Sequence, residues 1–183
     1  MNKTKDKSWK TLESEYLIQR PWLTARRDKV ELPTGVIHDE YYVLEYPDWI
    51  NVIAVTEDRQ MVMVRQYRYA LGITSCEIVA GVMEKGEDPQ TAAMRELQEE
   101  TGYAGGEWKK IMTLSPNPST NTNLCYCYLA TGVKKVSGQH LDETEDIDVC
   151  LFSKEEVKAM LERNEIKQAL MAAPLWWYFS ESK

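Results

Sequence analysis

The segment GVMEKGEDPQTAAMRELQEETGY, residues 81–103, contains a helix whose two ends are both marked by residue type. Asp88 is a good N-cap, and Pro89 suits the first helical position because the N–H that proline lacks would have no partner there. Gly102 suits the left-handed residue that commonly ends a helix. The sequence therefore predicts a helix over residues 89–101 with well-specified limits.

The apolar and acidic residues of this helix separate around its axis at the helical period of about 100° per residue. The predicted buried stripe consists of Ala93, Met94, Leu97 and Thr101. Glu96 and Glu100 lie at one edge of this stripe, and Glu99 lies slightly further round. We therefore expect the three carboxylates at the boundary of the core rather than on the solvent-facing side.

Grouping these glutamates is unfavourable without a counter-ion. Glu96 and Glu100 repel each other at i,i+4, and the C-terminal end of a helix disfavours negative charge, each at a cost on the order of a few tenths of a kcal/mol. A solvated charged face is the simpler interpretation of a glutamate-rich helix. However, three carboxylates on adjoining turns also supply the hard oxygen ligands that Mg²⁺ or Mn²⁺ prefers. Arg95 can pair with Glu99 or fold back to Glu87 and steady the loop before the helix.

Short segments of β-branched and aromatic residues predict strands on both sides of this helix. KVELPTGVIHDEYYVLEY predicts two strands around a turn at Pro33 and Gly35, and INVIAVT with MVMVRQYRY predicts a hairpin. Strands mixed with helices favour a layered α/β or α+β domain, in which helices pack on a sheet. Further strands are expected at CEIVAG, EWKKIMTL, NLCYCYLATG and DIDVCLF.

The two ends of the chain give less regular patterns. The first 15 or so residues are polar, and we expect them to be loose or helical on the surface. SKEEVKAMLERN predicts a helix with Ser153 as N-cap and Glu156 completing a capping box, and EIKQALMA, residues 165–172, predicts another. The aromatic run PLWWYF is expected to pack in the core or a subunit interface, or else to stack on a ligand.

Composition excludes several classes of partner. A net charge of −7 and a pI near 5.0 argue against nonspecific binding to nucleic acid or anionic membrane. The chain has no apolar run of about 18 residues, and MNKTKDKSWKTLESEY lacks the apolar stretch of a secretory signal, so we expect a cytoplasmic protein. The four cysteines are expected to be buried free thiols, as in a reducing compartment. A zinc site is not expected, because it would need Cys-x-x-Cys spacing or nearby histidines, and the chain has only His38 and His140.

Residues 81–103 resemble a Nudix box, the signature of the Nudix hydrolase family. The family pattern is Gly, five residues, Glu, seven residues, then Arg-Glu-apolar-x-Glu-Glu-x-Gly-apolar. The sequence matches this pattern at Gly81, Glu87, Arg95, Glu96, Leu97, Glu99, Glu100, Gly102 and Tyr103. The match is specific because it holds at nine spaced positions.

The resemblance implies a Nudix fold, which is a mixed sheet between helices, and Mg²⁺-dependent hydrolysis of a nucleoside diphosphate linked to another group. It implies that Glu96 and Glu100 are the main metal ligands, assisted by Glu99 and by the backbone carbonyl of Ala80. Arg95 is counted with Glu99 among the catalytic residues. The structural residues implied for the box are Gly81, Glu87 and Gly102.

Three further segments resemble the ADP-ribose pyrophosphatase branch of the family. EIVAG resembles the branch's Glu-x-x-Ala-Gly strand, and VRQYRY resembles its Gln-x-Arg segment, which implies that Arg68 contacts phosphate with help from Arg65. LDETEDIDV resembles the loop with the catalytic carboxylates, where Glu143 is our first choice of base and Glu145 our second. The alternatives are a surface arginine at a strand end and a solvated acidic loop.

Recognition of the base is expected to involve aromatic residues. Trp22 lies ahead of ELPTG as an adenine-stacking tryptophan does in some ADP-ribose pyrophosphatases, and Tyr41 or Tyr42 is the candidate second wall. Packing of the N-terminal strands is the alternative for Trp22. The resemblance also implies a homodimer in which the N-terminal region of one subunit helps to build the other's site. SPNPSTNTN, residues 115–123, is expected to be a mobile loop over the site.

These features together predict two domains: an antiparallel strand region at residues 1–46 for dimerisation and base binding, and a Nudix hydrolase domain at residues 47–183. We expect a cytoplasmic homodimer that cleaves ADP-ribose, or a related ADP-sugar, to AMP and a sugar phosphate with Mg²⁺, for which Mn²⁺ can substitute. Hydrolysis of GDP-mannose or of another nucleotide-sugar or dinucleotide is the nearest alternative. A non-catalytic ADP-ribose sensor is the alternative from another class.

Overall fold

The computed structural model describes residues 6–181, which form two compact units. The first unit comprises the described residues up to Tyr46 together with Asn117–Asn123. The second comprises Pro47–Pro116 and the described residues from Leu124 onward. The dimerisation and base-binding roles expected of residues 1–46 stay predictions.

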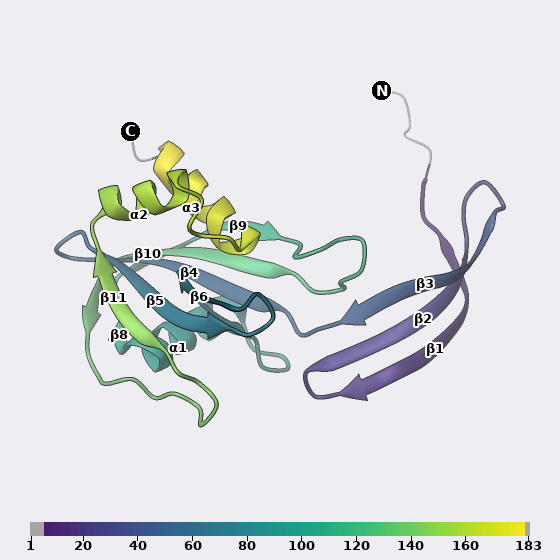
Figure 1. Ribbon diagram of the computed structural model, residues 1–183, viewed down its shortest axis with the longest axis horizontal. Coiled ribbons are helices and arrows are strands. Elements are labelled where there is room, and N and C mark those ends of the chain that lie inside the picture. Colours follow the sequence, from purple (N-terminus) through teal and green to yellow (C-terminus); the bar gives the residue numbers. More distant parts are fainter. Residues whose placement is uncertain (1–5, 182–183) are drawn as a thin grey trace. The chain divides into compact units, whose positions relative to one another are not determined.

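The N-terminal unit is a three-stranded antiparallel sheet in the order β1-β2-β3. Its strands are β1 (Lys10–Arg20), β2 (Leu23–Glu31) and β3 (Ile37–Glu45), drawn from purple to blue in Figure 1. Two strands around the turn at Pro33 and Gly35 are confirmed. A loose or helical start is wrong for residues 10–15, because these polar residues pair with β2, and this pairing outweighs the weak strand preference of the segment.

The segment expected to be a mobile loop forms hydrogen bonds with β3. Leu44 N–H donates to the Thr120 carbonyl at 2.7 Å, and Thr122 N–H donates to the Leu44 carbonyl at 3.1 Å. The Tyr41 hydroxyl donates to the Ser119 carbonyl at 2.5 Å. Residues 117–123 therefore belong to the N-terminal unit although they follow most of the second unit in sequence.

The second unit is built on an eight-stranded mixed sheet in which β4 and β10 are parallel and the other pairs antiparallel. The strand order is β11-β5-β4-β10-β8, and β6, β7 and β9 pair with β5, β4 and β10 respectively. The strand bounds are β4 (Trp49–Thr56), β5 (Met61–Arg68), β6 (Ile73–Glu77), β7 (Val79–Val82), β8 (Tyr103–Ala104), β9 (Glu107–Leu114), β10 (Cys125–Lys135) and β11 (Asp148–Phe152).

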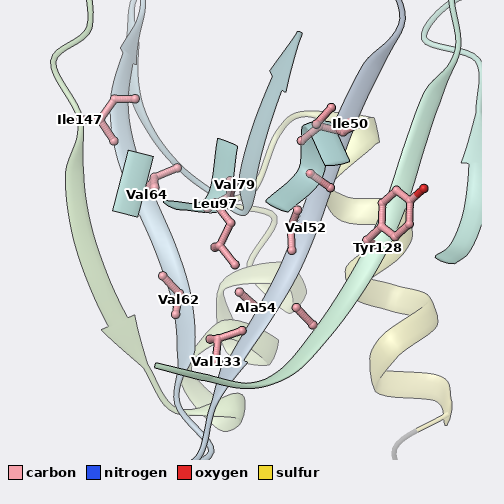
Figure 2. Packing of buried hydrophobic residues seen from close by; sticks show 13 residues of the cluster. Ile50, Val52, Ala54, Val62, Val64, Val79, Leu97, Tyr128, Val133 and Ile147 are labelled. Atoms are coloured by element: carbon pink, nitrogen blue, oxygen red, sulfur yellow. The ribbon is translucent and has the colours of Figure 1, made fainter. Parts of the chain in front are cut away.

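Helices cover both faces of this sheet: α1 (Pro89–Thr101) lies on one side, and α2 (Lys154–Glu162) and α3 (Ala169–Glu181) lie on the other (Figure 1). Because successive strand residues point to opposite faces, β4 contributes side chains to the hydrophobic layers on both faces of the sheet. Val52 packs in the layer with Leu97 of α1, as Figure 2 shows, whereas Ile53 packs with Leu175 of α3. The predicted mixed sheet between helices is confirmed.

Both predicted ends of α1 are confirmed. The Asp88 side chain accepts hydrogen bonds from the N–H groups of Gln90 and Thr91, and Gly102 has a left-handed φ of 71°. The predicted buried stripe is correct except for Met94, which is 42% exposed, while Ala92 is fully buried. The buried face is rotated toward Glu100, which is itself buried, and this rotation turns Met94 outward.

The C-terminal helices differ in how well the sequence predicts them. The capping box between Ser153 and Glu156 at the start of α2 is confirmed. The helix expected at residues 165–172 is misplaced, because α3 begins at Ala169 and continues to Glu181. Its aromatic run packs in the core through buried residues such as Tyr178. No helix within residues 6–181 is long and apolar enough to cross a membrane.

The four cysteines are free thiols, as expected. Cys125 and Cys127 are buried, and they pack with Leu170 of α3 in a small cluster. Cys76 and Cys150 are only partly buried, so the expectation of burial is confirmed for the Cys-x-Cys pair alone.

Candidate active site

The glycine that opens the box lies against the first of its clustered glutamates. Gly81 is on β7, and a methyl group added there would overlap the carboxylate of Glu96 on α1. Any larger residue would have to displace that carboxylate. The absence of a side chain at Gly81 therefore leaves room for the Glu96 carboxylate beside β7.

Arg95 joins the loop before α1 to the glutamates at its end. Nε and Nη2 of Arg95 each donate to Glu87 at 3.0 Å, and Nη2 also donates to the Val82 carbonyl at 3.1 Å. Nη1 donates at 2.9 Å to both Glu96 and Glu99. Both contacts expected of Arg95, with Glu99 and with Glu87, are thus present at once. The hydrogen bond from Arg95 is the main reason that the pKa of Glu87 is lowered.

Glu100 is the least satisfied carboxylate of the cluster. It is only 4% exposed, and its Oε2 has no hydrogen-bond partner among the described residues. Burial, followed by the negative charges of Glu96 and Glu145, raises the pKa of Glu100 to about 8, although a backbone hydrogen bond from Ala80 opposes this shift. Burial is likewise the first cause of the raised pKa of Glu96.

These carboxylates fit a divalent cation by chemistry, although they do not yet converge on one point. Among residues 6–181, no three Asp, Glu, His or Cys side chains are grouped as a ready metal site. Two of the expected ligands, Glu96 and Glu99, accept hydrogen bonds from Arg95 instead. The buried Oε2 of Glu100 nevertheless lacks a donor, and a hard cation would both supply a partner and relieve the like charges.

Arg68 is held by a residue that sequence reasoning did not select. Its Nε donates to Oε1 of Glu77 at 3.0 Å, and its Nη2 donates to Oε2 at 2.5 Å. The hydrogen bond from Glu77 is the largest cause of the raised pKa of Arg68, and the charge of Glu100 adds to it. The sequence signal that could have identified Glu77 is that it is the one carboxylate within the apolar segment CEIVAG. Arg65 is exposed and, by alternation along β5, points to the opposite face from Arg68.

The structure distinguishes the two glutamates of the acidic loop. The negative charge of Glu145 raises the pKa of both Glu96 and Glu100, so Glu145 lies within electrostatic range of the box. Its carboxylate also accepts a hydrogen bond from the Asp142 N–H at 2.9 Å. Both glutamates are exposed, but the charge of Glu143 is not among these causes.

The expected base-binding residues all belong to the N-terminal unit. Trp22 is 79% exposed in the turn between β1 and β2, so it does not pack against the strands of the N-terminal sheet. Tyr41 makes an edge contact with Trp9 at a centroid distance of 5.5 Å, in addition to its bond to Ser119. Tyr42 is 47% exposed.

Known proteins match the whole of this arrangement. Residues 9–44 match the nucleoside diphosphate sugar hydrolase N-terminal domain, and residues 46–173 match the NUDIX domain. A Bacillus subtilis ADP-ribose pyrophosphatase is 32% identical over 164 residues, which are 89% of this chain and 88% of that protein. A Bacillus methanolicus methanol dehydrogenase activator is 34% identical over 158 residues, which are 86% of this chain and 85% of that protein.

A solved structure described as an ADP compounds hydrolase has the same fold, with a TM-score of 0.83 at 20% identity and coverage of 98% of this chain and 99% of that one. Nudix hydrolases generally use a divalent metal ion, which agrees with the chemistry of the glutamate cluster. The chain belongs to the Nudix hydrolase family, as the resemblance of residues 81–103 predicts.

Proposed function

We propose that this chain hydrolyses the diphosphate bond of ADP-ribose, or of a related ADP-sugar, to give AMP and a sugar phosphate. The observation that carries the proposal is the buried Glu100, whose Oε2 has no hydrogen-bond partner among the described residues and which lies in a complete Nudix box with the partly buried Glu96. Similarity to ADP-ribose pyrophosphatases of Bacillus subtilis and Mycobacterium tuberculosis supports the choice of substrate.

Mg²⁺ is the proposed metal, with Mn²⁺ as a substitute. Glu96 and Glu100 would hold it, helped by Glu99 and the carbonyl of Ala80. A bound divalent ion supplies positive charge to the diphosphate and lowers the pKa of a water molecule. In this acidic chain, that charge complements a substrate that the protein's own net charge would repel.

Arg95 prepares this site by forming ion pairs with its carboxylates. In the metal-free protein its guanidinium neutralises Glu96 and Glu99, while its contacts with Glu87 and Val82 fix the loop. The Nη1 contacts are the ones that a metal ion would replace, because they engage the proposed ligands. Gly81 leaves room for α1 to lie close to the sheet, and Gly102 ends α1 after Thr101.

Glu145 is the loop carboxylate that we favour as general base. A carboxylate near the site can accept the proton of the attacking water or orient that water. The electrostatic coupling of Glu145 to Glu96 and Glu100 supports this choice over Glu143, which the sequence alone placed first. Arg68 is the proposed phosphate-contacting residue, and the opposite orientation of Arg65 supports only a secondary role for it.

A homodimer is the proposed assembly, and the N-terminal sheet supplies its interface. Every residue of β1 is exposed, including the apolar Tyr16, Leu17 and Ile18, and exposed apolar residues grouped on one strand are typical of a protein–protein interface. In such a dimer, stacking of the adenine on Trp22 and on Tyr41 or Tyr42 would contribute about 1–3 kcal/mol. Sedimentation equilibrium tests the dimer, and a monomer at all concentrations would contradict it. The cytoplasmic location stays a prediction that cell fractionation tests.

The proposed activity is tested with ADP-ribose, ADP-glucose, GDP-mannose, NADH and a diadenosine polyphosphate, each with Mg²⁺ and with products separated by chromatography. We expect AMP and a sugar phosphate from ADP-ribose, and no products from a Glu100→Gln variant. Faster hydrolysis of GDP-mannose would overturn the base preference; one relative is named a GDP-mannose pyrophosphatase. Hydrolysis of none would contradict the proposal and favour a sensor.

A further inference from the structure

Glu77 is a buried carboxylate outside the Nudix box, and its ion-pair partner is Arg68. The Glu77 side chain is 1% exposed at the end of β6, whereas the Arg68 side chain is 38% exposed at the end of β5. A buried carboxylate is strongly destabilising unless it is paired and hydrogen-bonded. The Arg68–Glu77 ion pair is therefore needed by the buried Glu77 carboxylate and is not a chance contact between surface side chains.

The two side chains meet through two parallel hydrogen bonds, from Nε to Oε1 at 3.0 Å and from Nη2 to Oε2 at 2.5 Å. Such a bidentate contact fixes the plane of the guanidinium. In the β5–β6 register, Glu77 lies opposite Val64 and Arg68 lies opposite Ile73, so Arg68 reaches back along the hairpin to Glu77. The arginine is thus bound along the edge that carries Nε.

The other edge of the guanidinium is available to a second anion. An arginine has five N–H donors in a planar fork, and Glu77 occupies one on Nε and one on Nη2. Among residues 6–181, Nη1 of Arg68 has no hydrogen-bond acceptor. The guanidinium also lies within electrostatic range of Glu100, which places it in the neighbourhood of the box glutamates.

We propose that Glu77 is a positioning residue, which holds Arg68 by its Nε edge so that the Nη1–Nη2 edge binds the diphosphate of the substrate. This inference rests on the proposed function. Glu77 acts through Arg68 and determines phosphate affinity, although it belongs to no part of the box. Lysine cannot replace Arg68 here, because its ammonium group lacks the planar fork that lets one guanidinium bind Glu77 along one edge and phosphate along the other.

A double-mutant cycle on nucleotide binding tests this proposal, with ADP as the probe in Mg²⁺ buffer and isothermal titration calorimetry as the readout. Glu77→Gln is expected to weaken ADP binding about tenfold, since it removes the charge that fixes a phosphate-binding arginine. In the Arg68→Ala background, the same substitution is expected to change ADP affinity by less than about twofold. With ADP-ribose as substrate, Glu77→Gln should raise KM more than it lowers kcat.

Two results would overturn the proposal. One is a Glu77→Gln variant that binds ADP as tightly as the wild type. The other is an equal loss of affinity with and without Arg68, because a purely structural carboxylate acts independently of the arginine. Glu165→Gln is the matched control: it breaks the exposed ion pair with Arg163 and is expected to leave ADP affinity unchanged.

Arg68→Lys keeps the test decisive where Glu77→Gln does not fold, as judged by circular dichroism. It retains the charge without the fork, so an affinity for ADP about tenfold lower supports the proposal, and wild-type affinity overturns it. ADP binding requires no turnover. A protein that binds ADP with the expected coupling but does not cleave ADP-ribose would contradict the proposed function and uphold the role of Glu77.

Discussion

Replacing Glu100 with glutamine is expected to stabilise the metal-free protein at neutral pH, although it removes a proposed metal ligand. Glu100 is buried, and one of its oxygens has no partner among the described residues. Its charge is further disfavoured by Glu96 and Glu145, so that its pKa rises from 4.5 to about 8. A glutamine has a similar shape and no charge, and it avoids most of this cost.

The sign and size of the effect follow from proton binding. Above the unfolded pKa of 4.5, the unfolded chain loses the Glu100 proton while the folded protein keeps it, until the pH passes about 8. The stabilising contribution is therefore complete at low pH and is lost as pH rises through this window. At about 1.4 kcal/mol per pH unit, the contribution of Glu100 to the free energy of unfolding of the wild type falls by roughly 3 kcal/mol by neutral pH.

The assay is urea unfolding of the metal-free wild type and Glu100→Gln, followed by circular dichroism at mildly acidic and at neutral pH. The variant is expected to lose less stability than the wild type as pH rises. Mg²⁺ is expected to stabilise the wild type at neutral pH and to have little effect on the variant. Glu162→Gln, at an exposed position of α2, is the control. Parallel pH dependences for wild type and Glu100→Gln would refute the reasoning.

Three other predictions concern the same site. Gly81→Ala is expected to weaken Mg²⁺ binding with little change in the free energy of unfolding, because the methyl group overlaps only the mobile carboxylate end of Glu96 and displaces it; an unchanged metal titration would contradict it. Glu145→Gln is expected to lower kcat by about 10²-fold or more with little change in metal affinity, and a larger loss from Glu143→Gln would return the base to that residue. Arg95→Lys is expected to lower Tm, because one ammonium cannot replace the five contacts of the guanidinium; an unchanged Tm in differential scanning calorimetry would argue against this role.

The helix α1 and the strands of the sheet were predictable because their signals lie within short stretches of the sequence. The ends of α1 depend on Asp88, Pro89 and Gly102, whose effects act within a turn of the chain. Strands such as β4 were predictable because both of their faces are buried, which requires an unbroken apolar run. The position of Glu100 at the edge of the core also follows from helical periodicity.

The features that the sequence did not predict depend on distant partners. The first half of β1, residues 10–15, is mostly polar and exposed, so only its pairing with β2 identifies it as a strand. The start of α3 at Ala169 is four residues later than the expected start of that helix at Glu165. Glu77 was overlooked because its burial and its contact with Arg68 arise from the hairpin between β5 and β6. Met94 was misassigned because the packing face of α1 is set by the sheet.

The central claim is that the glutamates of the box bind a divalent metal ion that in turn binds a diphosphate. Calorimetric titration of Mg²⁺ into the protein, with a non-hydrolysable ADP-ribose analogue present, tests it most directly. We expect saturable binding by the wild type and its loss in Glu100→Gln. The absence of saturable Mg²⁺ or Mn²⁺ binding by the wild type would contradict the claim.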